Sequence, residues 1–369
     1  MSEKKQIGIG IIGCGNISDA YFNGAKKFEV LKTISCADIN HEAAKAKAEE
    51  HECLAQSVEE LLANPDVDLV INLTIPAVHA EVSMAALNAG KHVHCEKPLA
   101  VTLEDGKKVM DLAAEKGLLV GCAPDTFLGA GLQTCRKLVD DGWIGDVVGG
   151  TAFMMSRGPE SWHPNPKFFY EVGAGPMFDM GPYYITALVH LLGPVKKVAA
   201  ITSKAFEVRT ATCKEQFGLP LPVEIPTHYS GTLEFHSGAS VNMTISFDVY
   251  AHNHKPIELY GTQGSIGVPD PNTFGGPVTL WTPTTGEWKD QGFSHPYKDN
   301  SRSIGAADMA MTILSGGTHP HKSSGALAYH ALEVMHAFEK SSVSGTHIMI
   351  ESKPEQPAPL PLGLIEGRV

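Results

Sequence analysis

A glycine-rich turn near the start of the chain has the residue types for dinucleotide binding. The run Gly13-Cys14-Gly15-Asn16-Ile17-Ser18 follows an apolar segment, 7–12, directly. Glycines at this place let the chain turn tightly out of a strand, so that backbone N–H groups approach a pyrophosphate at the N-terminus of the next helix. Ser18 stands where a third Gly or Ala is typical, and such turns often bind nothing. The motif alone therefore indicates a dinucleotide only weakly.

Asp38 strengthens this interpretation. It closes the second apolar segment, 30–37, about 20 residues beyond the glycines, where a carboxylate binds the ribose hydroxyls of the adenosine half. A carboxylate there repels a 2′-phosphate, and no arginine follows it, so the sequence favours NAD over NADP. The alternative is that Asp38 caps a helix that begins near His41. The order of strand, glycines and acid favours the ribose role.

A lysine follows a later strand, in the run Glu96-Lys97-Pro98. Ligands of open α/β sheets lie beyond the carboxyl ends of the strands, and Pro98 fixes the backbone there. Lys97 can donate to a substrate hydroxyl oxygen and stabilise the alkoxide that develops as a hydride leaves. A surface lysine paired with Glu96 is an equally good interpretation of these residues alone.

An acid and a phenol lie four residues apart further along the chain. The glycine-rich run 173–178 leads to a helix that is predicted to begin near Asp179 and to end at Gly193-Pro194. Asp179 and Tyr183 then project from one face of its first turn, as a candidate pair for proton transfer. An N-terminal carboxylate that is favoured by the helix dipole, with a tyrosine packed over it, would give the same pattern.

The elements that position these residues follow from hydrophobic periodicity. Strands are predicted at 7–12, 31–37, 69–74, 92–95 and 118–122, and helices at 42–50, 58–62, 78–88 and 103–116. This alternation predicts an α/β fold, with a Rossmann-type, doubly wound parallel sheet in an N-terminal domain, residues 1–125.

Beyond residue 125 the pattern changes. Strands are predicted at 147–155, 195–206, 227–236, 239–249, 257–260 and 265–268, and helices at 131–141, 304–314 and 326–340. They predict a C-terminal α+β domain, residues 126–369, with a large, mainly antiparallel open sheet. Segment 241–249 is expected to show apolar residues on both faces. The proline-rich tail 354–361 is expected to be extended, and residues 365–368 match a protease-site linker that is added for protein expression, so no function is assigned to them.

Composition excludes several classes of protein. The 369 residues exceed one ordinary core, which also favours two domains. A net charge of −12 argues against nucleic acid or an anionic membrane as partner. No signal-like or membrane-length apolar run is found, so we expect a cytoplasmic protein. The seven cysteines form no C-x-x-C pair and are predicted to be buried thiols. No metal site is expected, because the histidine pairs 252/254 and 319/321 have no Cys or acid at ligand spacing and are interpreted as surface or loop residues.

In order and spacing, these motifs resemble the family of glucose-fructose oxidoreductase, inositol dehydrogenase and MocA (Gfo/Idh/MocA). The resemblance rests on the glycine turn, Thr74-Ile75-Pro76 with His79, the Glu96-Lys97-Pro98 run, and the approach to Asp179-x-Gly-x-Tyr183, and it covers essentially the whole chain. It implies an NAD-dependent oxidoreductase that acts on hydroxyl groups of small sugars or polyols. It also implies a homodimer or homotetramer formed through the C-terminal sheet.

The resemblance assigns roles to individual residues. The catalytic lysine of the family falls on Lys97, its aspartate on Asp179, and its general base, histidine in many members and tyrosine in the glucose-fructose branch, on Tyr183. The residues predicted to bind the cofactor are Gly13, Gly15, Asn16, Ile17, Asp38, Thr74, Pro76, His79, Glu96 and Lys97. The residues predicted to bind substrate are Lys97, Asp125, Trp162, His163, Asp179 and Tyr183.

A tyrosine base needs help, because a free phenol titrates near pH 10. The ammonium group of Lys97 should lower the pKa of Tyr183, and Asp179 opposes this unless it pairs with the lysine first. We therefore expect Lys97 and Tyr183 to act as a coupled pair with Asp179 positioning the lysine. His163 is the alternative base.

The substrate is expected to be a neutral sugar or polyol. Loop 158–166 carries Trp162, whose face can stack on a sugar ring, although a proline-rich loop also buries an aromatic side chain to fix itself. Where relatives commonly have Asn or Arg, this chain has Ala123-Pro124-Asp125, and the missing arginine argues against acidic substrates. Two alternatives to a dehydrogenase remain. One is a glycosidase of the same family that oxidises its substrate transiently, and the other, less favoured, is a sugar sensor without catalysis.

Overall fold

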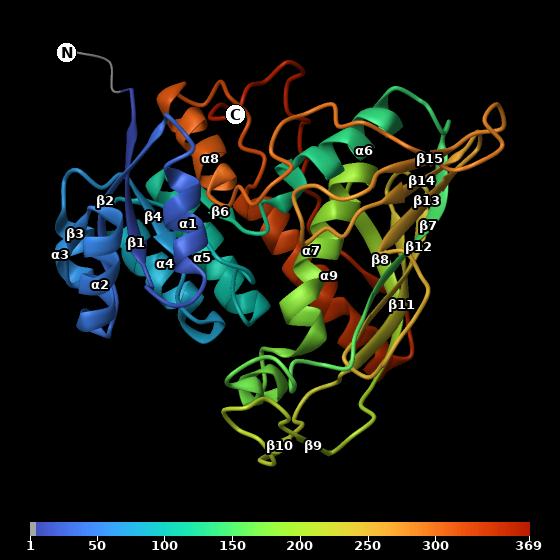
Figure 1. Ribbon diagram of the computed structural model, residues 1–369, viewed down its shortest axis with the longest axis horizontal. Helices are drawn as coiled ribbons and strands as arrows, with labels where there is room; N and C mark the ends of the chain where they lie inside the picture. The colour runs from blue at the N-terminus through green and yellow to red at the C-terminus, as the bar shows by residue number, and fades with distance from the viewer. Residues whose placement is uncertain (1–4) are drawn as a thin grey trace.

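The computed structural model describes residues 5–369 and places two sheets side by side (Figure 1). The first is a six-stranded parallel sheet in the order β3-β2-β1-β4-β5-β6. The second is a nine-stranded, mainly antiparallel sheet in the order β16-β15-β14-β13-β7-β12-β11-β8-β17. Both predicted sheet types are confirmed.

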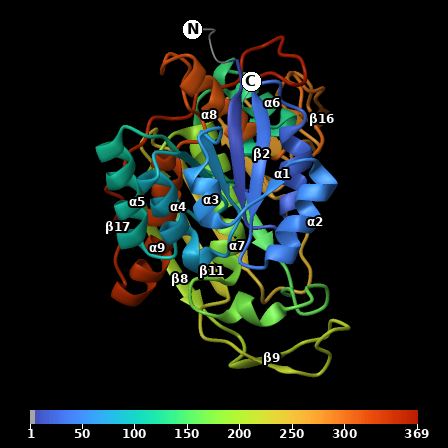
Figure 2. The ribbon, with the colours of Figure 1, turned by 90° about the vertical axis from the view of Figure 1, so that its left-hand side faces the viewer.

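The N-terminal sheet is covered on both faces. Its strands are β1 (Ile7–Ile12), β2 (Leu31–Ala37), β3 (Leu54–Ala55), β4 (Leu69–Asn72), β5 (His92–Cys95) and β6 (Val120–Cys122). Its helices are α1 (Ser18–Ala25), α2 (His41–His51), α3 (Val58–Ala63), α4 (His79–Asn88) and α5 (Leu103–Lys116). Figure 2 shows α1 and α2 on one side of the strands and α4 and α5 on the other, which is why the central strands are continuously apolar. The strand order reverses between β1 and β4, where ligands of such sheets bind.

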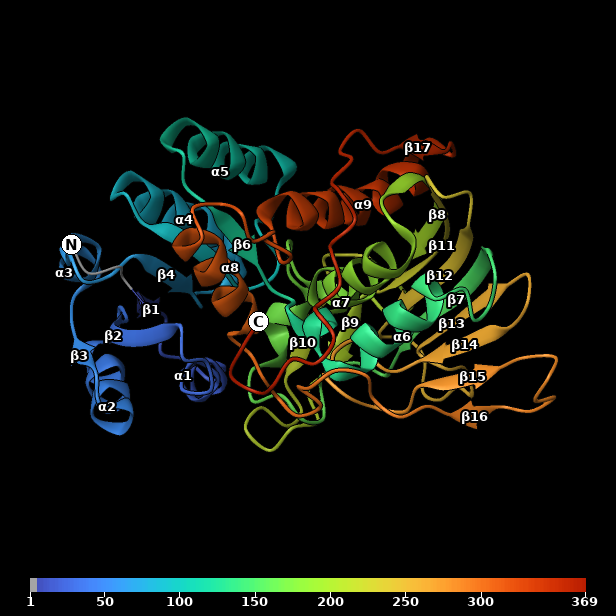
Figure 3. The same ribbon diagram turned by 90° about the horizontal axis from the view of Figure 1, so that it is seen from above.

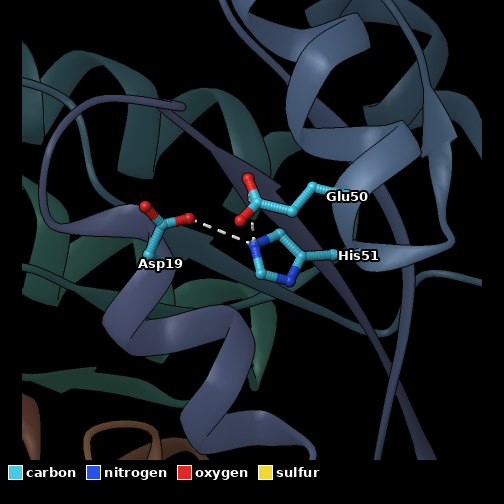
Figure 4. Close-up of side chains that lie close together, drawn as sticks. All are labelled: Asp19, Glu50 and His51. Atoms are coloured by element: carbon cyan, nitrogen blue, oxygen red, sulfur yellow. Dashed lines mark hydrogen bonds and ion pairs between the residues drawn. The ribbon is translucent and has the colours of Figure 1, made fainter.

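A cluster of charged side chains fixes α1 to α2. Asp19 of α1 lies against Glu50 and His51 of α2 (Figure 4). The Lys47 ammonium donates to both carboxylates, and the His51 ring stacks on Phe22 with the ring centres 4.2 Å apart. The Lys47 ammonium thus lies between the two carboxylates, and the group forms an ion-pair contact between the two helices.

The C-terminal sheet has helices on one face only (Figure 3). Its strands are β7 (Val147–Met155), β8 (Val195–Ser203), β11 (His228–Phe235), β12 (Ser240–Ser246), β13 (Ile257–Gly261), β14 (Ser265–Val268), β15 (Thr279–Trp281), β16 (Lys289–Asp290) and β17 (Ile348–Met349). The covering helices are α6 (Ala130–Asp140), α7 (Gly175–Leu192) and α9 (Gly325–Ser344). A separate ribbon of β9 (Val208–Thr210) and β10 (Pro220–Pro222) lies at the lower edge in Figure 1.

The bare face of this sheet is polar along β12. Val241, Met243 and Ile245 are buried, whereas Ser240 and Asn242 are exposed. The expectation of apolar residues on both faces of this segment is therefore wrong, because the alternation places every apolar residue of the strand under the helices. The expected second copy on this face stays a prediction.

After the sheet, the chain returns to the N-terminal layer. Helix α8 (Ile304–Leu314) packs on β6 and α1, and Gly121 of β6 pairs with Ser324 (Figure 1). The division between residues 125 and 126 stays a prediction, and α8 shows that residues late in the chain complete the N-terminal layer.

The C-terminal tail 354–361 forms no helix or strand, and the last residues of the chain are part of the fold. Arg136 of α6 donates to the Pro357 carbonyl, and the Leu360 N–H donates to Gln133. The buried Tyr297 donates to the Arg368 carbonyl. Residues 365–368 are thus hydrogen-bonded to the core, unlike a linker that is merely attached to the end of a folded chain.

Two predictions on composition can be compared with the structure. All seven cysteines are free, and six are buried, with Cys53 partly exposed, which confirms the prediction of buried thiols. Within residues 5–369, no helix is long and apolar enough to cross a membrane.

We predict that Gly24→Ala destabilises the protein. A Cβ atom at Gly24 in α1 would lie 1.7 Å from the Arg302 carbonyl oxygen, so the helix and the segment before α8 would have to separate. Although alanine favours helix by about 1 kcal/mol over glycine, overpacking should lower the free energy of unfolding by about 1–3 kcal/mol, measured by urea denaturation. Gly292→Ala, whose Cβ meets open space, is the matched control. Equal stability of the two variants would contradict the close packing.

Candidate active site

A cavity of about 360 Å³ opens where the N-terminal strands end and α7 begins. The predicted site residues that line it are Ile17, Thr74, Pro76, His79, Glu96, Lys97, Trp162, His163, Asp179 and Tyr183. An adjoining cavity of about 270 Å³ shares Lys97, Trp162, Asp179 and Tyr183 with it. The structure thus brings residues of both layers to one place.

Lys97 and Asp179 form an ion pair at the centre of this cavity. Nζ of Lys97 donates to Oδ1 of Asp179 and to the Asp179 carbonyl oxygen, each at 2.7 Å. Burial by itself would lower the pKa of Lys97, but Asp179, Tyr183 and Glu96 outweigh it and hold that pKa above its ordinary value. The lysine is therefore an ammonium group, and Asp179 accepts both of these hydrogen bonds.

Helix α7 begins four residues earlier than predicted, at Gly175. Asp179 and Tyr183 therefore lie in its second and third turns and not in the first, but their spacing still places them on one face. Pro182 lacks the N–H that would bond to the Phe178 carbonyl, which loosens the helix at the point where Lys97 bonds to the next carbonyl.

Tyr183 is buried beside the ammonium group. Nζ of Lys97 lies 5.4 Å from the centre of the phenol ring. Burial raises the pKa of Tyr183, and although Lys97 and Arg302 lower it, the pKa stays above its ordinary value. Lys97 thus acts on the pKa of Tyr183 in the expected direction, but desolvation outweighs both cations, and the phenol is protonated at neutral pH.

The Glu96 carboxylate fixes the backbone at Lys97. Its Oε1 accepts a hydrogen bond from the Tyr21 hydroxyl at 2.6 Å, and its Oε2 accepts one from the Lys97 N–H at 2.9 Å. Glu96 is buried, so these bonds fix the backbone from which Lys97 projects. The alternative of a surface Glu–Lys pair is wrong.

His79 joins the two loops on the cofactor side of the cavity. Its ring nitrogens lie 2.7 Å from the Pro98 carbonyl oxygen and 2.8 Å from that of Thr74. Since carbonyl oxygens only accept, both nitrogens must donate. Burial alone would lower the pKa of His79, but Cys95 and these carbonyls raise it to about 9. The imidazolium therefore holds the segments 74–76 and 97–98 together.

The glycine turn fits a dinucleotide. Gly13 has a φ of +103°, and a Cβ there would lie 2.6 Å from the Leu73 carbonyl oxygen, so only glycine fits. Gly15 and Asn16 are exposed, and no side chain caps α1 at Ile17, so the N-terminus of this helix is accessible to a pyrophosphate. The Ser18 and Ala20 N–H groups donate to the carbonyls of Gly15 and Ile17.

Asp38 is fixed at the edge of this turn. Its Oδ2 accepts from the Cys14 N–H at 2.7 Å and its Oδ1 from the Asn40 N–H at 2.8 Å. Asn40 itself caps α2, because its side chain accepts from the Glu42 N–H. The alternative role of Asp38 as the helix cap is therefore wrong.

Asp125 does not line the cavity, although it was predicted to contact substrate. The side chain is buried, and its Oδ2 accepts from the Gly305 N–H at 3.1 Å. Burial raises the pKa of Asp125 to about 6, even though Gly305 and Arg302 favour the ionised form.

Trp162 and His163 lie at the rim of the cavity. Trp162 is 66% exposed, and its ring meets those of His163 and Phe169 edge-on. Nδ1 of His163 accepts from the Asn165 N–H, which leaves Nε2 as its free ring atom.

Arg302 is a site residue that the sequence analysis missed. It lines the adjoining cavity, and its Nη2 lies 3.3 Å from the Tyr183 hydroxyl. It stands in an irregular segment before α8, where no motif or periodicity marks it. An arginine therefore reaches the site, contrary to the argument from residues 123–125.

The two histidine pairs differ. His252 and His254 are exposed, as predicted. Nε2 of His319 instead lies 2.9 Å from Oδ1 of the buried Asp308, which also accepts a hydrogen bond from Lys322 at 2.7 Å. The fold therefore places an acid beside the second pair, although none lies at ligand spacing in the sequence. Burial lowers the pKa of His321 to about 4, which keeps its ring neutral.

Models of known protein families match both parts of the chain. The model of an oxidoreductase family with an NAD-binding Rossmann fold matches residues 7–123, and that of the GFO/IDH/MocA C-terminal domain matches residues 132–267. A 1,5-anhydro-D-fructose reductase of Ensifer adhaerens is 35% identical over 264 residues, which are 70% of this chain and 74% of the reductase. An uncharacterized oxidoreductase of Schizosaccharomyces pombe is 33% identical over 148 residues, 39% of each chain.

A solved structure shows the same fold. A levoglucosan dehydrogenase in complex with NADH and L-sorbose superposes with a TM-score of 0.80 and 22% identity, over 94% of this chain and 100% of the other.

We predict that Asp125→Asn stabilises the protein increasingly as the pH rises. The folded-state pKa of about 6 lies above the ordinary value near 3.9, so the carboxyl group's contribution to stability is present below about pH 4 and is lost as the pH rises through 6. The neutral amide avoids this loss. The variant should gain on the order of 2–3 kcal/mol over the wild type between about pH 4 and pH 7 in urea denaturation. A difference that does not depend on pH would contradict the buried carboxyl group.

Proposed function

This chain belongs to the Gfo/Idh/MocA family of oxidoreductases, and we propose that it is an NAD-dependent dehydrogenase that oxidises a hydroxyl group of a neutral sugar or polyol to a carbonyl. The observation that carries the proposal is the Lys97–Asp179 ion pair, which lies beside Tyr183 in a cavity whose other wall is the cofactor side of the N-terminal sheet.

The chain's own residues supply the acid–base chemistry. A bound nicotinamide would accept the hydride. Lys97 donates to the substrate oxygen and stabilises negative charge on it while the C–H bond breaks, and Asp179 keeps the ammonium group oriented. Tyr183 accepts the hydroxyl proton in oxidation and returns it in reduction. The raised pKa of Tyr183 supports a phenol that is ready to donate in the reductive direction.

The charge of the cavity supports a neutral substrate. Lys97, Arg302 and the His79 imidazolium contribute three formal positive charges, and Asp179 and Glu96 contribute two negative ones. Both N–H groups of His79 are already bonded to carbonyl oxygens, so around Lys97 and Arg302 the two carboxylates balance the two cations and leave little charge to attract a phosphate or a carboxylate. The exposed face of Trp162 at the rim gives a sugar ring an apolar surface, and the similar proteins of known activity include a reductase of an anhydro sugar.

Turnover tests the proposal against its alternatives. Neutral hexoses, pentoses and inositols are incubated with NAD, and reduced cofactor is followed by its absorbance. Accumulation of NADH supports the dehydrogenase. Cleavage of a glycoside without net NADH would identify the glycosidase instead. Sugar binding without any turnover would identify a sensor.

We predict that Tyr183→Phe lowers turnover by about 10²–10⁴-fold, because it removes the proton acceptor. NADH binding, measured by fluorescence, should stay unchanged. The control is Tyr184→Phe, since the neighbouring hydroxyl bonds to the Phe153 carbonyl and does not line the cavity. Near-normal turnover of the first variant would move the base elsewhere, and His163→Asn then tests the alternative base.

We propose that Asp38 makes NAD the preferred cofactor, and we predict that Asp38→Asn weakens this preference. The amide oxygen can still accept a backbone hydrogen bond, but it no longer repels a 2′-phosphate. The ratio of NADPH to NADH dissociation constants, obtained from cofactor fluorescence, should fall by about 10-fold, or 1.4 kcal/mol. An unchanged ratio would mean that Asp38 does not face the ribose.

A further inference from the structure

We propose that Arg302 is a positioning residue of the reaction, whose guanidinium group holds the Tyr183 oxygen and stabilises its phenolate form. The proposal rests on the proposed function, in which Tyr183 exchanges the proton. It separates two tasks that the sequence analysis gave to Lys97 alone.

The geometry divides these tasks between two cations. Lys97 commits two hydrogen bonds to Asp179 and lies beside the phenol ring, 5.4 Å from its centre. Arg302, in contrast, reaches the phenol oxygen itself, at 3.3 Å from Nη2. Among residues 5–369, Arg302 is the side chain that donates to this oxygen. Lys97 is thus left to donate to the substrate oxygen, while Arg302 donates to the oxygen of the base, Tyr183.

Arg302 keeps its charge in this place. Burial alone would lower the pKa of Arg302, but Tyr183 and Asp125 outweigh burial and raise it. A guanidinium group has five N–H donors. Among the described residues, Tyr183 accepts a hydrogen bond from the guanidinium group of Arg302. A permanent cation beside the oxygen favours the phenolate and opposes the effect of burial on Tyr183.

The segment that carries Arg302 is anchored on the cofactor layer. The hydroxyl of Ser303 donates to the Tyr21 carbonyl at 2.9 Å, and the Arg302 carbonyl packs on Gly24 of α1. Lys27 of the same layer donates to the Asn300 carbonyl. Tyr183 belongs to α7 of the other layer, so the Arg302–Tyr183 contact spans the cavity and sets the position of the phenol relative to the cofactor side.

The proton and electrons balance in this scheme. In oxidation, the phenol of Tyr183 first loses its proton to solvent. The substrate O–H proton then moves to the phenolate oxygen, and the carbon loses a hydride, with its electron pair, to the oxidised cofactor as the C=O bond forms. Arg302 stabilises the phenolate before the transfer. In reduction, the neutral phenol donates the proton, and Arg302 stabilises the phenolate that is left.

A titration that needs no substrate tests the proposal. The tyrosines are replaced by difluorotyrosine, whose phenol is more acidic than that of tyrosine, and the fluorine signal of residue 183 is assigned by its loss in Tyr183→Phe. We predict that Arg302→Gln raises the titration midpoint of this signal by about 1 pH unit or more, because a cation next to the oxygen is lost. Arg302→Lys keeps a charge and should raise it less.

Controls separate the contact from general damage. Arg157→Gln removes an exposed arginine that lies over Tyr250 and should leave the midpoint unchanged. The melting temperature and NADH fluorescence identify any variant that does not fold, and Arg302→Lys then carries the test. An unchanged or lowered midpoint in a folded Arg302 variant overturns the proposal.

Kinetics distinguishes failure of this inference from failure of the proposed function. With a sugar that is turned over, Arg302→Gln should shift the rising limb of kcat/KM for oxidation to higher pH by about 1 unit, and it should have no further effect in the Tyr183→Phe background. Turnover with an unshifted limb overturns the role of Arg302 and leaves the dehydrogenase intact. A shifted fluorine midpoint without turnover of any sugar leaves the contact intact and overturns the dehydrogenase.

Discussion

The site depends on the ion pair between Lys97 and Asp179, which joins the end of a parallel strand to a helix of the other layer. An ion pair that is largely removed from water stabilises a fold little by itself, since desolvation offsets much of the attraction. Both partners must nevertheless be present, because a buried charge without its partner destabilises the fold. Glu96 and His79 secure the lysine side, so the pair sets the distance between the two walls of the cavity.

Burial and charge act against each other on Tyr183. Desolvation favours the neutral phenol, whereas Lys97 and Arg302 favour the phenolate. Around Tyr183, the two cations Lys97 and Arg302 are balanced by the two carboxylates Asp179 and Glu96, an arrangement that suits an uncharged substrate. The same balance keeps a neutral phenol available at rest, with cations placed to stabilise the anion that proton transfer produces.

Residues late in the chain hold the site together. The segment before α8 carries Arg302 and packs on α1, next to the glycine turn. Tyr297 in this segment bonds to the Arg368 carbonyl, so the C-terminal tail supports it from outside. The segment 297–302 thus bonds to the end of the chain through Tyr297 and to the phenol of Tyr183 through Arg302.

The sequence by itself determined the parallel sheet, the glycine turn, Asp38, Lys97, and the common face of Asp179 and Tyr183, because each depends on local periodicity or short spacing. Only the tertiary structure decided that Arg302 reaches Tyr183, since they lie 119 positions apart in the sequence and no local pattern marks such a contact. It also turned Asp125 away from the cavity, where the Gly305 N–H binds it. The physical reason is that spacing fixes the face of an element, whereas packing of distant segments fixes which side chains meet and how much water remains around them.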